Sequence, residues 1–397
     1  MSWYERVEKY LLTLKCPKTG LFPSVAGQSH TLYGTVYGWQ TLKFLGSGEQ
    51  PPPQVFEWIL ENQEPETGLF RGPELTSWKP APGNKHDELH LLRHLTLATL
   101  PFLLEHGVKP KHDLSDALQF CNQESLARWL ASRDWSDAWF EGNNLLFIGL
   151  YLLYLRDYYQ FTEASAALER WFVWLDSEVD PATGMWGTDK GSSVFNGMCG
   201  AYHQYLVYYQ EERPLQYPRK IVDNTLALQH PDGGFSPSGW GGACEDVDAV
   251  DILVNQFKLN DYRRSDIKFA LARCRNRILS SQNPDGGFSY RHGEPGSHMG
   301  LPATEHSAYE SAVFPTWFRI HTLALIAEIL PSEKTYGFNS ICSMGWHKNP
   351  NPEYWNAVSR NYHCNVNMLI SKSFKYKIFL ARSIARRVKQ RILPLHL

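Results

Sequence analysis

The chain has 397 residues, of which 43% are hydrophobic and 14% aromatic, enough to build a large buried core. Its formal net charge of −2 excludes a strong overall attraction to nucleic acid or to anionic lipid. Seven scattered cysteines without CxxC spacing, and the lack of an apolar signal core or of an apolar run of membrane length, predict a cytoplasmic protein.

A short glycine-containing turn recurs along the chain about every 50 residues. Its first copies read Pro-x-Thr-Gly and its last two read Pro-Asp-Gly-Gly-Phe, at residues 17–22, 65–70, 181–186, 231–235 and 284–288. A degenerate copy fits at residues 134–139. Such a period indicates a repeat architecture, in which each unit buries its apolar face against its neighbours.

Each turn lies between two predicted helices of different character. The helix before the turn is amphipathic, which is typical of an outer layer, at residues 3–14, 55–62, 114–132, 164–177, 219–229 and 266–282. The helix after it is apolar around most of its circumference, at residues 30–45, 86–104, 143–157, 196–210, 246–259 and 306–330. This alternation predicts an all-α fold, a single (α/α)6 barrel over residues 1–370. An open solenoid is the alternative, although tetratricopeptide units are shorter, at about 34 residues.

In such a ring the inner helices run in the same direction, so their N-terminal ends meet at one mouth. Helix capping explains one polar residue at each of these ends, but it does not explain four acids within seven positions. The sequence therefore predicts an active site there. Its expected binding residues are His86, His90, Glu141, Asn143, Trp240, Tyr309 and Trp317.

The densest acidic cluster starts the predicted helix at residues 246–259. Asp248 and Asp251 share a helix face, and Asp246 lies at the helix entry. Crowded carboxylates do not all ionise easily, so one of them should keep its proton near neutral pH and serve as a general acid. The expected catalytic residues are Asp248, Asp246, Asp251, Glu305 and His306. A solvated acidic helix start is the alternative.

The Gly-Gly-Phe turns that follow Gln229 and Gln282 resemble the glutamine–tryptophan repeats of the terpenoid cyclase and protein prenyltransferase superfamily. Residues 233–253 resemble the segment of squalene–hopene-type cyclases that ends in Asp-x-Asp-Asp, although Ala249 replaces one acid. In that family the middle Asp, which corresponds to Asp248, protonates the substrate. The resemblance implies an isomerase-like enzyme that starts acid chemistry on an isoprenoid or another lipid-like substrate.

The same resemblance raises the question of zinc. Prenyltransferases bind zinc through an Asp-x-Cys pair and a distant His, and this chain offers Cys244, Asp246 and His306 with the first two in reversed order. No cofactor is expected otherwise. His86 and His90 are a second possible metal pair, because they are four residues apart on one helix.

Two other functions remain open. Single α/α barrels also resemble unsaturated-uronide hydrolases and other glycan-active enzymes, hydrolases or lyases, in which two carboxylates flank the glycosidic bond. Asp248 with Glu141 or Glu305 would supply that pair. The second alternative is a non-catalytic helical-repeat binding protein.

Residues 371–397 carry eight basic side chains and no acid, with apolar residues at helical spacing. This pattern predicts a basic amphipathic C-terminal helix, which either binds an anionic membrane surface peripherally or packs on the barrel. No nucleic-acid recognition motif accompanies it, so nucleic acid is not an expected partner.

Overall fold

The computed structural model describes residues 1–80, 85–239 and 241–337. In these residues the secondary structure is helical, apart from five isolated β-bridges. The predicted C-terminal helix at residues 371–397 lies outside the described residues. Within the described part, no helix is both long enough and apolar enough to cross a membrane.

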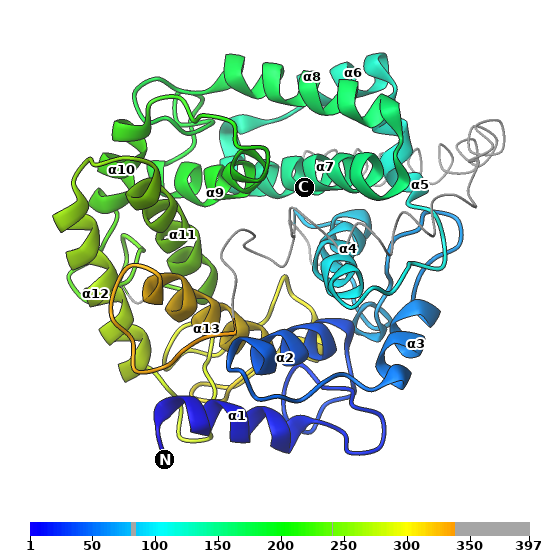
Figure 1. The fold of residues 1–397 in the computed structure, drawn as a ribbon, viewed down its shortest axis with the longest axis vertical. Helices are drawn as coiled ribbons and strands as arrows, with labels where there is room; N and C mark the ends of the chain where they lie inside the picture. Colours follow the sequence, from blue (N-terminus) through cyan, green and yellow to red (C-terminus); the bar gives the residue numbers. More distant parts are fainter. Residues whose placement is uncertain (81–84, 240, 338–397) are drawn as a thin grey trace, which may run out of the picture.

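In the part of the chain that the structure describes, six inner helices form a closed ring (Figure 1). Each packs against the next along the chain, and the last returns to the first. They are α2 (Leu32–Phe44), α4 (Glu88–Glu105), α7 (Ala138–Tyr159), α9 (Val194–Gln210), α11 (Ala243–Leu259) and α13 (Val313–Ala327).

Six outer helices among the described residues surround this ring (Figure 1). They are α1 (Trp3–Leu14), α3 (Pro53–Glu61), α6 (Gln123–Ala131), α8 (Thr162–Glu178), α10 (Pro218–Ala227) and α12 (Arg264–Ser280). Short elements connect some of them, namely η1 (Pro73–Leu75), α5 (Ser115–Leu118), η2 (Gln119–Cys121), η3 (Trp135–Asp137) and η4 (Pro302–Thr304). The predicted (α/α)6 barrel is therefore confirmed.

The repeated turns are joined to the next outer helix by glutamine side chains. Gln229 donates from Nε2 to the carbonyl oxygen of Gly233 in its own turn and to that of Ala270 in α12, at 3.0 and 2.8 Å. Gln282 does the same for Gly286 and for Trp3 in α1, at 2.7 and 2.8 Å. The last unit is thereby joined to the first, so the hydrogen bonds of the glutamine side chains help to close the barrel.

Helices α7 and α9 approach each other through glycines. A Cβ atom built on Gly142 would lie 2.6 Å from the Cα atom of Gly200, and one on Gly200 would lie 2.2 Å from the carbonyl oxygen of Ala138. Both distances are below any real carbon contact, so only glycine allows this packing. The close approach brings the first turns of α7 and α9 side by side at the mouth of the ring.

Two predicted helices differ in the structure. The helix predicted from residue 306 begins at Val313, because the preceding residues form a loop that contains η4 and Tyr309 with a φ of 61°. Pro315 consequently lies in the first turn of α13, where its missing N–H breaks no helical hydrogen bond. The helix predicted at residues 114–132 is divided into α5, η2 and α6.

Candidate active site

A cavity of about 470 Å³ lies at the N-terminal ends of the inner helices. Helices α4, α7, α9, α11 and α13 contribute to its wall, together with the segments that precede α4 and α7 and the loop between α12 and α13. Its lining residues are Lys85, His86, His94, Asp137, Trp139, Phe140, Asn143, Asn196, Tyr202, His203, Cys244, Asp248, Tyr290, Ser297, His298, Met299, Phe314 and Phe318.

Asp248 is the carboxyl group in the buried part of this wall. Its side chain belongs to α11 and is only 2% exposed, and the thiol of Cys199 in α9 hydrogen-bonds to it. Its Oδ2 atom is buried and has no hydrogen-bond partner in the described part of the chain. Burial, and after it the charge of Glu245, raises the pKa of Asp248 well above its usual range. Its surroundings therefore favour the protonated form of this buried acid.

Asp246, two residues earlier on α11, has the opposite surroundings. Its fully buried carboxylate accepts hydrogen bonds from Arg277 at 2.9 Å and from Arg319. It also accepts from the backbone N–H of Phe235 in the repeated turn, at 2.8 Å. Two guanidinium groups neutralise this carboxylate, so it anchors the start of α11 and faces away from the cavity.

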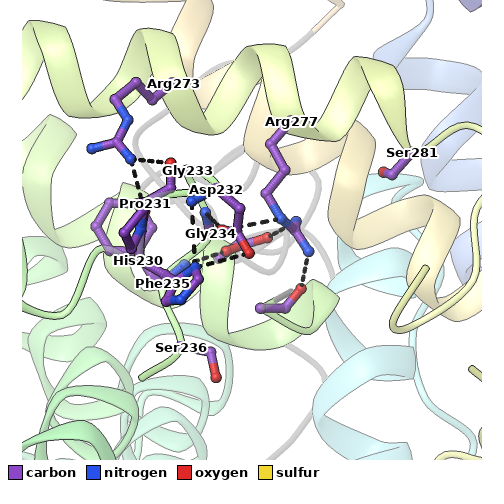
Figure 2. A network of polar contacts seen from close by, with 12 residues as sticks. His230, Pro231, Asp232, Gly233, Gly234, Phe235, Ser236, Arg273, Arg277 and Ser281 are labelled. Carbon is purple, nitrogen blue, oxygen red and sulfur yellow. Dashed lines mark hydrogen bonds and ion pairs between the residues drawn. The ribbon is translucent and has the colours of Figure 1, made fainter. Parts of the chain in front are cut away.

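The two arginines extend this anchor to the turn before α11. Arg277 and Arg319 each donate to the carbonyl oxygen of Gly241, at 2.9 Å. Figure 2 shows Arg273 and Arg277 reaching from α12 onto the turn at residues 230–235, where Arg273 donates to the carbonyl oxygen of His230 at 2.9 Å. The turn, α11, α12 and α13 are thus joined by one buried polar network.

Glu245 forms a third arrangement at the same helix end. It is 1% exposed and accepts hydrogen bonds from the hydroxyl of Tyr290 and from Arg291, both at 2.8 Å. Tyr290 lines the cavity, so this pair attaches the loop between α12 and α13 to α11. The charge of Glu245 remains close enough to Asp248 to favour the protonated form of that acid.

Three histidines of the cavity wall are neutral at physiological pH. Burial lowers the pKa of His94 to about 3 and that of His203 to about 4, and it holds the pKa of His298 well below its usual range. Nε2 of His298 is buried without a partner among the described residues, whereas the imidazole of His203 interacts with the backbone of Cys199 and Gly200 in its own helix. The wall therefore offers neutral imidazoles, which can donate or accept hydrogen bonds.

The outer part of the cavity is polar and aromatic. Lys85 forms an ion pair with Asp137, which precedes α7. Trp139 is partly buried and packs edge-on against Phe195, with ring centroids 5.8 Å apart. Asn143 and Asn196 lie on the cavity wall beside these aromatic rings. Because Lys85 and Asp137 neutralise each other, this part of the wall carries no net charge.

The structure brings some of the predicted site residues together. Asp248, His86 and Asn143 line the same cavity, and Cys244 lies beside them. His90 lies behind the wall, where its Nδ1 atom is 3.2 Å from Oδ1 of Asn144 and its ring stacks on Phe140.

Other predicted residues lie outside the cavity wall. Glu141 pairs with Arg133 at 2.8 Å, and Asp251 accepts a hydrogen bond from Asn255 at 2.9 Å. Glu305 is exposed, and the backbone of His306 pairs with Gly296. Tyr309 is 58% exposed, and Trp317 is fully buried against Tyr37. Trp240 lies outside the described residues.

Sequence reasoning missed several residues of the wall. Ser297, His298 and Met299 come from an irregular loop, where no periodic pattern marks a side chain that points inward. Phe314 and Phe318 line the cavity, whereas Trp317 on the same helix does not. Their spacing of four residues would have identified the face of α13, had its start been placed correctly.

The predicted zinc ligands are not gathered into a site. Asp246 is occupied by two arginines, and His306 lies in the loop before α13. In residues 1–80, 85–239 and 241–337, no group of three or more His, Cys, Asp or Glu side chains is arranged to hold a metal ion.

Comparison with known proteins gives structural similarity alone. No protein-family profile matches this sequence, and no curated protein matches it. One similar solved structure is a polysaccharide lyase, with a TM-score of 0.46 and 13% identity over 82% of this chain and 96% of that one. Another is the GH76A α-1,6-mannanase from Salegentibacter sp. HEL1_6, with a TM-score of 0.47 and 12% identity over 83% and 100%. A third is a glycosyl hydrolase family 88 protein from Bacteroides vulgatus, with a TM-score of 0.46 and 12% identity over 82% and 97%.

These three structures are glycan-active enzymes and not terpenoid cyclases or prenyltransferases, so the predicted membership of that superfamily was wrong. The predicted isoprenoid chemistry, which depended on it, was wrong as well. The physical reason lies in the turns that carried the resemblance. Gln229 and Gln282 join neighbouring outer helices, which is a requirement of the barrel and is independent of its reaction.

Proposed function

We propose that this protein is a glycan-active enzyme, a hydrolase or a lyase, in which Asp248 acts as the general acid. One observation carries the proposal, namely the buried carboxyl group of Asp248 with an unpartnered Oδ2 on the wall of a ligand-sized cavity. A carboxyl group that stays protonated near neutral pH can give its proton to the oxygen of a breaking glycosidic bond.

The composition of the cavity wall supports a sugar as the ligand. Sugars are uncharged at most positions, carry many hydroxyl groups, and present C–H faces that pack on aromatic rings. The wall matches these properties with neutral histidines, with Asn143 and Asn196, and with the rings of Trp139 and Phe140. A lipid-like ligand would leave most of these polar groups without hydrogen bonds, and burying polar groups unpaired is costly.

The second catalytic group comes from a different residue than expected. The glycan interpretation of the sequence paired Asp248 with Glu141 or Glu305, but neither of these lines the cavity. His203 is the better base, because it lines the cavity and burial lowers its pKa to about 4, so its imidazole is neutral at physiological pH. In hydrolysis this base would activate a water molecule, and in a lyase it would remove a proton from the sugar carbon.

The test is cleavage of a panel of neutral and uronate-containing oligosaccharides by the purified protein. New reducing ends without an unsaturated product indicate a hydrolase, and a conjugated, ultraviolet-absorbing uronate indicates a lyase. On the cleaved glycan, Asp248→Asn should lower kcat by about 10²–10⁴-fold, the usual contribution of a general acid.

Asp176→Asn is the matched control. Asp176 is a partly buried Asp of α8 that accepts a hydrogen bond from Tyr208 at 2.7 Å, away from the cavity, and Asn can still accept that bond. This variant should keep wild-type turnover. Wild-type turnover by Asp248→Asn, or no cleavage of any glycan on the panel, would refute the proposed function.

A further inference from the structure

Tyr33 of α2 makes a hydrogen bond behind the cavity wall with His94 of α4. Its hydroxyl lies 2.7 Å from Nδ1 of His94, and both side chains are buried. The backbone of Tyr33 is also held, because its N–H donates to Oε1 of the buried Glu74 at 3.0 Å. The side chain is therefore fixed at its base and at its tip.

The chemistry of this contact decides which atom holds the proton. A buried tyrosine hydroxyl needs an acceptor for its hydrogen, and within the described residues Tyr33 has one partner for it, Nδ1 of His94. If Nδ1 carried the imidazole proton, it would donate to Tyr33 and leave the buried O–H hydrogen unpaired. The lower-energy arrangement has Tyr33 donating to Nδ1.

A neutral imidazole with an accepting Nδ1 carries its proton on Nε2. His94 lines the cavity, and because Tyr33 occupies Nδ1, Nε2 is the ring nitrogen that remains for a ligand. We propose that Tyr33 is a positioning residue that holds the proton of neutral His94 on Nε2, so that His94 donates a hydrogen bond to a ligand oxygen and does not act as a base. That the ligand is a glycan rests on the proposed function above.

The groups around His94 are compatible with a neutral donor. Tyr33 contacts it from α2, His298 packs on it from the loop with ring centroids 5.0 Å apart, and His203 and His86 are the titratable groups close enough to act on it electrostatically. Burial keeps the pKa of His94 at about 3, so the ring stays neutral over the physiological range. Two neutral histidines then have different tasks, since His94 donates and His203 accepts.

The first test is the tautomer of His94, measured by two-bond ¹H–¹⁵N correlation NMR on the full chain with labelled histidine. His94→Gln identifies the signal by its absence. Wild-type protein should show the Nε2–H form of the neutral ring, and Tyr33→Phe, which removes only the hydroxyl, should show a mixture or the Nδ1–H form.

Tyr37→Phe is the matched control for this test. Tyr37 lies one turn further along α2, its ring stacks on Tyr33 at 5.8 Å, and its buried hydroxyl has no partner among the described residues. Its removal should leave the His94 signal unchanged. An Nδ1–H ring in the wild-type protein would overturn the proposal, even if Tyr33→Phe does not fold. The same holds if the His94 signal in Tyr33→Phe equals that of the wild type.

Turnover gives an independent readout. On a glycan that the enzyme cleaves, Tyr33→Phe should lower kcat/KM by about tenfold, the effect of one misdirected hydrogen bond, whereas Tyr37→Phe should not. Equal kcat/KM for Tyr33→Phe and wild type would overturn the proposal that Tyr33 prepares His94 to donate a hydrogen bond to the ligand. An Nε2–H tautomer that depends on Tyr33, in a protein that cleaves no glycan, would support the inference about His94 and refute only the proposed function.

Discussion

Asp246 and Asp248 belong to the same helix end and have opposite surroundings. Asp246 is held by Arg277, Arg319 and a backbone N–H, so its charge is fully compensated. Asp248 lines the cavity, and its buried Oδ2 has no partner in the described part of the chain. Residues two apart on a helix lie on different faces. Asp246 therefore contacts the neighbouring helices of the barrel, whereas Asp248 lies at the cavity.

This comparison separates structural acids from reactive ones. A buried carboxylate with compensating cations stabilises the fold by pairing with them, and its removal leaves those cations without a partner. The ionised form of an uncompensated buried acid is destabilised in the folded protein, so its pKa is raised and it keeps a proton that it can donate. The three predictions below test the difference between the two regions, from the largest expected effect to the smallest.

The largest effect is expected from removal of the anchor. Asp246→Ala leaves two buried guanidinium groups without their carboxylate, so the free energy of unfolding should fall by about 3–5 kcal/mol. Urea denaturation of the variant and of the wild type measures this difference. Arg263, which forms exposed ion pairs with Asp223 and Asp266, is the control, because Arg263→Ala should cost no more than about 1 kcal/mol. Similar losses in the two variants would remove the distinction between a buried anchor and a surface ion pair.

The second effect concerns the pH dependence of stability. The pKa of Asp248 is raised in the folded state, so its contribution to stability is complete below the ordinary carboxyl pKa and is lost as pH rises toward the raised value. Asp248→Asn does not titrate, whereas the histidines of the cavity titrate equally in both proteins. Relative to this variant, the wild type should therefore lose up to about 1.4 kcal/mol per pH unit above about pH 4.

Urea denaturation of both proteins at several pH values between about 4 and 8 measures this slope. A constant difference between them across that range would show that the carboxyl group of Asp248 ionises normally in the folded protein. The proposed general acid would then lose its basis.

The smallest effect is expected at the aromatic part of the cavity. Trp139→Ala removes a ring that would pack on a sugar face, so KM should rise about tenfold, which corresponds to about 1.4 kcal/mol. Stability should change little, because Trp139 is only partly buried. Steady-state kinetics on the cleaved glycan would check the first statement and thermal unfolding the second. A large loss of stability with unchanged KM would show that Trp139 supports the fold and does not bind the ligand.

The sequence by itself determined the barrel. The recurring turn, with apolar helices after it and amphipathic helices before it, predicts six units, and these are local properties of the chain. The boundaries of most helices follow for the same reason, since capping and hydrophobic periodicity act over a few residues. The exceptions are α13, whose start depends on an irregular loop that no periodic pattern describes, and the helix predicted at residues 114–132, which is divided into α5, η2 and α6.

Tertiary structure alone decided which polar residues form the site. The resemblance singled out Asp248 among the three acids at this helix start, but only the folded structure shows that Asp248 lines the cavity whereas Asp246 and Asp251 do not. Arg277 and Arg319 lie far from Asp246 in the chain, so their compensation of its charge depends on how α12 and α13 pack against α11. His298 and the pairing of Tyr33 with His94 likewise arise from contacts between distant segments. Protonation and reactivity depend on these neighbours, because desolvation and nearby charge act through space and not along the chain.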